Sequence, residues 1–266
     1  MKTFKTFQVI FSFEIYENIR SRWLIFNTVA FFLFSSILIY YGNSEPLSVI
    51  SSLLNLSLLI LPLFSLLFGS ISFIESMPYF EFILIRDVKR SILFLGKYLG
   101  ISLGLSFSYI IGLGISYISI LGFSNNLIHL FSLLSFGVLL IFLFIAISFL
   151  LSILIQKKEL LYGFTLFCWF YFYILYDLLI IAFSVLYRDY PLEIPILILV
   201  FLNPIDLVRI ATLLQFKLSN LMGFGTALFQ KVLGDTSGFW ISIFCLSLWI
   251  CIPLFIAYKK FLKKDL

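Results

Sequence analysis

Long apolar stretches without charged residues dominate the chain and predict membrane-spanning helices. No Lys, Arg, Asp or Glu occurs in the 29 residues between Glu45 and Glu75, and residues 98–156 carry only His129 as a titratable side chain beyond tyrosine. A bilayer hydrocarbon core about 30 Å thick needs about 20 apolar helical residues, and an apolar helix satisfies its own backbone hydrogen bonds there. The first stretch is therefore long enough to cross a membrane once, and the second is long enough to cross twice.

The same reasoning along the whole chain predicts one all-α integral membrane domain, residues 1–266, with six transmembrane helices and no soluble domain. The expected spans are residues 23–41, 47–74, 98–122, 130–155, 160–187 and 239–258. A further apolar segment, residues 194–202, has nine residues, or about 14 Å of helix. It is too short to span, so we expect it to be re-entrant or interfacial.

Basic residues set the expected orientation in the cytoplasmic (inner) membrane. With an even number of spans and a cytoplasmic N-terminus, 14 of the 18 Lys and Arg residues face the cytoplasm, as the positive-inside rule requires. Both termini and residues 156–159 are then cytoplasmic, and residues 188–238 face outward. The net charge of +5 fits this anchoring role. Nucleic-acid binding is not expected, because no basic patch accompanies a soluble recognition fold.

Patterns that indicate catalysis, metal ions or cofactors are sparse. The three cysteines lie in apolar stretches without a Cys-x-x-Cys pair, and His129 stands apart. Asp177 is the only acid inside an expected span, and such a carboxylate is a candidate functional group, although Arg209 or nearby tyrosines could instead satisfy it structurally. An intramembrane enzyme would need paired catalytic groups, so we do not expect one. The chain also lacks the Gly-x-x-x-x-Gly-Lys-Ser/Thr loop that cradles ATP phosphates.

Apolar and charged positions alternate in residues 75–97, between the second and third expected spans. This mixture favours a short helix along the cytoplasmic surface, with one face available to a partner. An ordinary loop with positive anchors fits the composition as well. The charged candidates for partner coupling are Glu75, Glu81, Arg86, Arg90 and Lys97.

A helix start is predicted at Asn203 in the outward-facing region between the fifth and sixth spans. Asn203 can cap the helix, Pro204 suits its first turn, and Asp206 favours its positive end. Asp206 and Arg209 are three residues apart and can pair on one face. We expect this pair to be exposed, on a helix ending near Lys217 that is followed by a second amphipathic segment. The region is then either a docking platform for a periplasmic partner or a lid that caps itself.

Small residues recur along the third expected span and predict a face for close helix packing. They are Gly100, Ser102, Gly104, Ser106, Ser108, Gly112 and Gly114.

Charged residues between the second and third spans also carry a family resemblance. Glu81, Arg90 and the Gly96-Lys97 pair match the helix-turn that ABC-2 type transporter permeases place there, whereas Pro78-Tyr79 and Asp87 depart from that pattern. The chain as a whole resembles this family. The resemblance implies an amphipathic N-terminal helix, six spans and a homodimer. It also implies a separate cytoplasmic ATPase that docks on the charged stretch and supplies the ATP hydrolysis, so that this subunit is not an enzyme.

Four short segments carry a narrower resemblance: residues 20–24, 176–178, 203–209 and 221–225. In order and spacing they are similar to the membrane subunits of transporters that mature nitrous oxide reductase. This resemblance implies a role in assembling that enzyme's copper sites, with a periplasmic solenoid-type accessory protein as partner. Soft metal ligands, Cys and Met, do not form a continuous row across the expected spans. We therefore expect this subunit to transmit force rather than conduct copper. The alternative is a generic ABC-2 exporter of a lipid, drug or other hydrophobic substrate.

Overall fold

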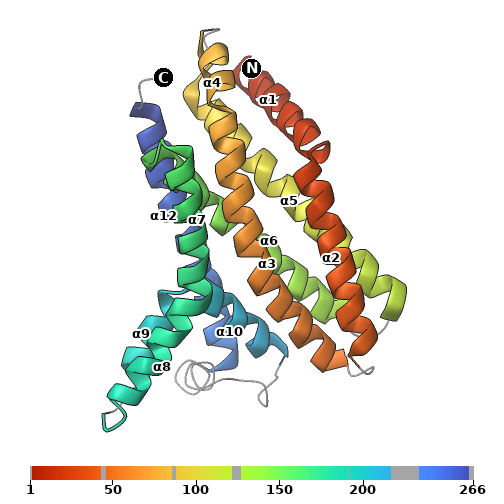
Figure 1. Ribbon diagram of the computed structural model, residues 1–266, viewed down its shortest axis with the longest axis vertical. Helices are drawn as coiled ribbons and strands as arrows, with labels where there is room; N and C mark the ends of the chain where they lie inside the picture. The colour runs from red at the N-terminus through yellow and green to blue at the C-terminus, as the bar shows by residue number, and fades with distance from the viewer. Residues whose placement is uncertain are drawn as a thin grey trace.

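The computed structural model describes residues 2–42, 46–85, 88–121, 127–190, 192–216 and 234–263, and its regular elements there are helical (Figure 1). Within these residues, six helical stretches are long and apolar enough to cross a membrane, which confirms the predicted all-α membrane architecture. The elements in chain order are α1 (Lys2–Ile19), α2 (Arg22–Tyr41), α3 (Pro46–Glu75), α4 (Met77–Leu84), α5 (Arg90–Leu121), α6 (Leu127–Leu154), α7 (Lys158–Phe170), the π-helical segment η1 (Tyr171–Leu175), α8 (Tyr176–Leu186), α9 (Glu193–Phe201), α10 (Pro204–Phe216) and α12 (Asp235–Lys263).

The two chain ends lie at the same end of the molecule, with α4 beside them (Figure 1). Helices α8, α9 and α10 lie toward the opposite end. An even number of crossings gives this arrangement, so the geometry fits the expected topology. For the rest of the description, the end with α1 and α4 is called the terminal end, and the end with the α8–α9 turn is called the distal end.

Small side chains on α5 allow α1 and α2 to pack closely against it. A Cβ added to Gly112 would lie 2.6 Å from the carbonyl oxygen of Thr28 on α2, and one added to Gly100 would lie 2.6 Å from Cβ of Glu14 on α1. The predicted packing face is confirmed at these two positions. Gly114 differs, because an added Cβ would meet nothing within 4 Å.

Helix α5 begins at Arg90, eight residues before the expected start of the third span at Tyr98. The sequence places the start of the span after the charge of Lys97, whereas the helix itself extends back to Arg90. In the structure Lys97 is buried in α5, where it pairs with Glu14 of α1. A buried cation is tolerated when an opposite charge contacts it.

Helices α9 and α10 meet at an angle of 107° across a short break. The short apolar segment of residues 194–202 therefore forms one arm of a broken span or re-entrant pair, as its length suggests. Helix α10 ends at Phe216, one residue before the expected Lys217. Helix α10 packs against α6 and α12, so the second arm of the pair lies inside the helix bundle. The second amphipathic segment and the 221–225 segment lie outside the described residues.

Candidate functional site

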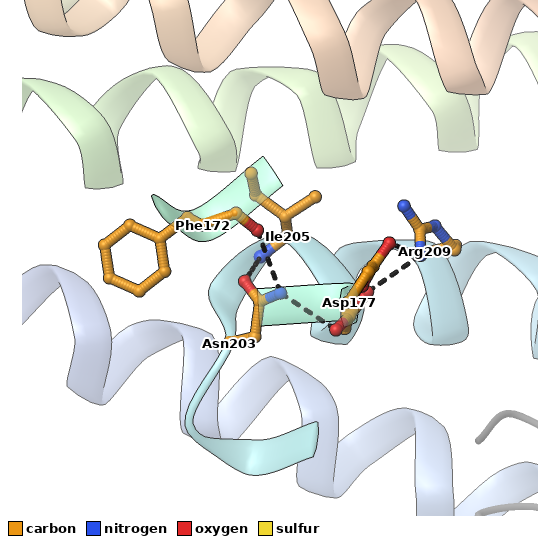
Figure 2. Close-up of polar contacts among 6 residues, drawn as sticks. Phe172, Asp177, Asn203, Ile205 and Arg209 are labelled. Atoms are coloured by element: carbon orange, nitrogen blue, oxygen red, sulfur yellow. Dashed lines mark hydrogen bonds and ion pairs between the residues drawn. The ribbon is translucent and has the colours of Figure 1, made fainter. Parts of the chain in front are cut away.

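Two segments that are distant in the sequence meet in one polar network (Figure 2). Arg209 Nη1 lies 2.9 Å from Asp206 Oδ1 and 3.3 Å from Asp177 Oδ2. The side-chain amide of Asn203 donates hydrogen bonds to Asp206 Oδ2 at 2.8 Å and to the carbonyl oxygen of Phe172 at 3.1 Å. The network therefore joins the first half of α10 to both α8 and η1.

The start of α10 follows the predicted capping pattern. Asn203 Oδ1 accepts a hydrogen bond from the backbone N–H of Ile205 at 3.1 Å, and the Asn203 carbonyl accepts one from Leu207 N–H at 3.1 Å. Pro204 occupies the first helical position, where its missing N–H removes no helical hydrogen bond. The cap predicted from the sequence is confirmed. The same Asn203 side chain also reaches η1, a second role that the sequence does not reveal.

Side chains from other helices satisfy backbone carbonyls around the break between α9 and α10. Tyr176 Oη donates to the carbonyl of Leu199 at 2.6 Å, and Trp249 Nε1 of α12 donates to the carbonyl of Phe201 at 3.1 Å. A helix that ends inside a membrane protein needs such donors, because lipid supplies none. Sequence reasoning missed both residues. Tyr176 could have been noticed as the neighbour of Asp177, whereas nothing in the sequence distinguishes Trp249.

Burial of the network corrects the expectation of an exposed ion pair. Asn203 is 0% exposed and Asp206 is 5% exposed, and Pro204 is buried as well. The expectation is wrong because α10 folds back against α6 and α12 instead of lying on the outer surface. Only Arg209 and Asp177 keep partly exposed side chains, at 29% and 37%. Asp177 pairs with Arg209, the structural partner that the sequence analysis names for it.

Helix α4 forms the candidate coupling element at the terminal end. Phe80 is fully buried. The centroid of its ring lies 6.1 Å from that of Phe73 of α3 and 5.8 Å from that of Phe261 of α12. Glu81 on the same helix is exposed, Phe82 is 60% exposed, and Ile85 just beyond the helix is 81% exposed. The predicted short helix is therefore present, anchored through Phe80. It presents an acid together with apolar side chains.

The remaining coupling candidates have different environments. Glu75 is exposed at the end of α3, and Arg86 lies outside the described residues. Arg90 Nη1 donates to the carbonyl of Leu262 at 3.2 Å, which ties the start of α5 to the last turn of α12. Lys97 Nζ lies 2.7 Å from Glu14 Oε2, with side chains only 5% and 1% exposed. Lys97 thus joins α5 to α1 and offers little surface to a partner.

Glu14 was not among the candidates taken from the sequence, yet it forms the most deeply buried ion pair of the described residues. Burial raises the pKa of Glu14, and the Lys97 ammonium opposes that rise. A signal was available in the sequence, since Ile10, Glu14 and Asn18 recur at helical spacing and all three are buried on one face of α1.

Metal binding has no obvious centre in the part of the chain that the structure describes. No group of three or more His, Cys, Asp or Glu side chains is placed there so that it could hold a metal ion.

The long apolar helices define a multi-pass membrane protein. Comparison with known proteins gives its class. A profile of the family described as "ABC-2 family transporter protein" matches residues 59–266, so the chain belongs to the ABC-2 transporter family. It is a permease subunit of an ABC transporter.

Two curated relatives are similar over nearly the whole chain. The "Probable ABC transporter permease protein NosY" of Pseudomonas aeruginosa is 29% identical over 95% of this chain and 96% of that protein. The protein of the same name from Stutzerimonas stutzeri is 26% identical over 94% of this chain and 96% of its own length. Membership of an ABC permease family implies a partner ATPase.

Proposed function

We propose that this chain is the membrane subunit of an ABC transporter that couples ATP hydrolysis to maturation of nitrous oxide reductase, the copper enzyme of denitrification. In this proposal a cytoplasmic ATPase binds at the terminal end. A periplasmic solenoid-type protein binds at the distal end, and two copies of this chain form the membrane domain. The chain itself holds no cofactor and carries out no catalysis.

The observation that carries this proposal is the polar network at the break before α10. The segments 176–178 and 203–209 were two of the four that resembled nitrous oxide reductase maturation permeases. They contribute Asp177, Asn203, Asp206 and Arg209 to one set of contacts. Similarity to two NosY permeases over more than nine-tenths of the chain agrees with that resemblance.

Burial of the network changes how a periplasmic partner would use it. Asn203, Pro204 and Asp206 are enclosed, so their proposed role is to fix the angle between α9 and α10. Arg209 and Asp177 remain partly exposed and are the members that a partner can reach. Exposed residues of the α8–α9 turn, such as Tyr187 and Tyr190, would extend the docking surface.

The proposed orientation places the terminal end in the cytoplasm. Its supports are the 14-to-4 division of basic residues and the position of both chain ends beside α4 (Figure 1). Single cysteines at Lys263 and Asp189 would test it. In intact cells, a membrane-impermeant thiol reagent should label the cysteine at position 189 and spare the one at position 263. The reverse pattern would reject this orientation.

Homodimer formation has support from the fifth span. The stretch of α7, η1 and α8 is apolar, yet only 6% of the residues in its apolar 18-residue segment are buried within the described structure. A span so little covered by the described residues is available to lipid or to a second copy. Crosslinking between single cysteines placed on α7 would distinguish these two neighbours, and a failure to crosslink at any α7 position would argue against a dimer through this face.

One observation favours the alternative of a generic exporter. A cavity of about 340 Å³ lies beside the end of α9 and is lined almost entirely by apolar side chains of α12 and of the end of α9, among them Phe201, Leu248 and Trp249. Such a cavity suits a hydrophobic molecule.

Deletion of the gene in a denitrifying host separates the two functions. The proposal predicts that nitrous oxide reductase accumulates without a full set of copper ions and without activity, and that the wild-type gene restores both. Normal copper content and activity in the deletion strain would remove the maturation function and leave the exporter as the better description.

A further inference from the structure

A polar cavity of about 220 Å³ lies at the terminal end, and two of the coupling candidates, Glu75 and Lys97, contribute to its lining. It is open on one side and lined by residues of α1, α2, α3 and α4, together with Lys97 of α5.

The charges that line the cavity favour a cationic group. Glu17 of α1 and Glu75 of α3 both line it, and neither has an ion-pair partner among the residues that the structure describes. Lys97 is the basic residue of the lining, but its ammonium already lies 2.7 Å from Glu14. Two carboxylates therefore remain without a counter-charge among the described residues, and the rings of Trp23 and Tyr79 line the same cavity. Aromatic faces and carboxylates together attract ammonium groups.

Donors for a phosphate lie in the same lining. Lys97 has three N–H donors, and its contact with Glu14 uses only part of that capacity. Asn18 is 4% exposed, lines the cavity, and its side-chain nitrogen has no hydrogen-bond partner within the described ranges. The cavity thus offers acceptors for an ammonium and buried donors for an anionic oxygen.

Apolar side chains continue from the cavity along the seam between α2 and α3. The rings of Trp23 and Phe68 have centroids 6.4 Å apart, and those of Phe26 and Phe64 are 5.7 Å apart. Trp23 and Phe26 are also substantially exposed. Because α2 and α3 are both membrane spans, this aromatic seam runs from the cavity toward the hydrocarbon region.

We propose that this cavity binds the headgroup of an aminophospholipid of the phosphatidylethanolamine type, drawn from the leaflet at the terminal end. The ammonium lies between Glu17 and Glu75, the phosphate lies near Lys97 and Asn18, and the acyl chains follow the seam between α2 and α3. A bound lipid would fasten α1 and α4 to the spans. This inference does not depend on the proposed function, because binding of a lipid to the purified subunit requires neither the ATPase nor a periplasmic protein.

Native mass spectrometry of the full-length protein in detergent tests the proposal by titration with phosphatidylethanolamine and with phosphatidylglycerol. The wild type should bind phosphatidylethanolamine more tightly. The Glu17→Gln/Glu75→Gln variant should lose about tenfold in that affinity, with phosphatidylglycerol binding unchanged. Asp189→Asn, an exposed acid at the distal end, is the matched control and should bind as the wild type does. Glu17→Gln alone replaces the double variant if the latter does not fold.

Two further measurements locate the lipid and identify its source. Phosphatidylethanolamine with brominated acyl chains should quench tryptophan fluorescence in the wild type, and Trp23→Phe should remove most of the quenchable signal. Soluble phosphoethanolamine should fail to displace the lipid. Equal affinities for the two lipids, an equal loss of both in the double variant, or displacement by soluble phosphoethanolamine would each overturn the proposal.

Discussion

Arg209 contacts Asp177 across 32 positions of sequence, with Nη1 and Oδ2 only 3.3 Å apart. The same Nη1 lies 2.9 Å from Asp206, so one guanidinium serves two carboxylates. Because Asp177 belongs to α8 and Asp206 to α10, the contact fixes α8, at the end of the fifth span, against the returning arm of the broken helix pair. Movement of either helix would have to break a contact of Arg209.

Replacing Arg209 with Met is expected to destabilise the protein more than replacing either acid. Loss of the guanidinium leaves two carboxylates close together without a cation, whereas Asp177→Asn or Asp206→Asn leaves one pair intact. Removing one partner of a buried pair costs about 3–5 kcal/mol. Because Arg209 is 29% exposed, we expect about 1–3 kcal/mol here.

Thermal unfolding in detergent measures this order. The unfolding temperature is expected to be highest for the wild type and to fall in the order Asp177→Asn, Asp206→Asn and Arg209→Met. A triple variant with both acids and the arginine neutralised should recover part of the loss. If Arg209→Met were as stable as the wild type, the network would have no structural role.

The buried pair of Lys97 and Glu14 predicts a pH-dependent defect. Lys97→Met leaves a buried carboxylate unpaired and should cost about 3–5 kcal/mol at neutral pH. Burial raises the pKa of Glu14 and Lys97 opposes that rise, so its removal raises the pKa further. A carboxyl whose folded-state pKa is raised stabilises the fold when protonated, and this contribution is lost as pH rises through the folded-state value.

The Lys97→Met variant should therefore unfold at a higher temperature near about pH 5 than near about pH 8, and the wild type should change less. Glu14→Gln/Lys97→Met removes the charge and should abolish the extra pH dependence. A Lys97→Met variant with the wild-type pH profile would mean that Glu14 is not held unpaired in the fold.

Two glycines on α5 form a matched pair for testing the packing against α2. In Gly112→Ala the new Cβ would lie 2.6 Å from Thr28 O and 2.9 Å from Phe31 Cβ, so the helices must separate, at a cost of about 1–3 kcal/mol. Gly114→Ala meets open space and should leave the unfolding temperature unchanged or slightly higher. Equal effects of the two substitutions would contradict the close contact at Gly112.

The span pattern was readable from the sequence because lipid exposure imposes long uncharged stretches, and the cap at Asn203 was readable because local backbone chemistry determines it. The tertiary contacts of Asp206 and Lys97 could not be predicted from local sequence patterns. Whether Asp206 faces water or protein depends on the 107° turn between α9 and α10, and no local pattern specifies that angle. Likewise, the charge of Lys97 predicts a membrane boundary, and no local pattern shows that Glu14, 83 positions away, pairs with it inside the fold.

Charge reversal at Glu81 tests the coupling role of α4. Glu81 is exposed, while the neighbouring Phe80 anchors the helix, so Glu81→Arg should leave the fold intact. A reversed charge at an interface can cost several kcal/mol, so we expect about a tenfold loss or more in binding of the ATPase and in stimulated ATP turnover. Asp189→Arg at the distal end is the control. Arg90→Glu is a poorer probe, because it also removes the hydrogen bond to Leu262. Normal ATPase binding and turnover in Glu81→Arg would reject this role.

Affinity purification of the tagged chain from cells that express its native operon tests the central claim most directly. We predict that the wild type retains both an ABC ATPase and an extracytoplasmic protein, that Glu81→Arg loses only the ATPase, and that Tyr190→Glu on the exposed α8–α9 turn loses only the extracytoplasmic protein. Each variant must first show a monodisperse, folded membrane subunit. If the wild type retains the ATPase but no extracytoplasmic protein, the proposed role in enzyme maturation is contradicted and the generic exporter takes its place.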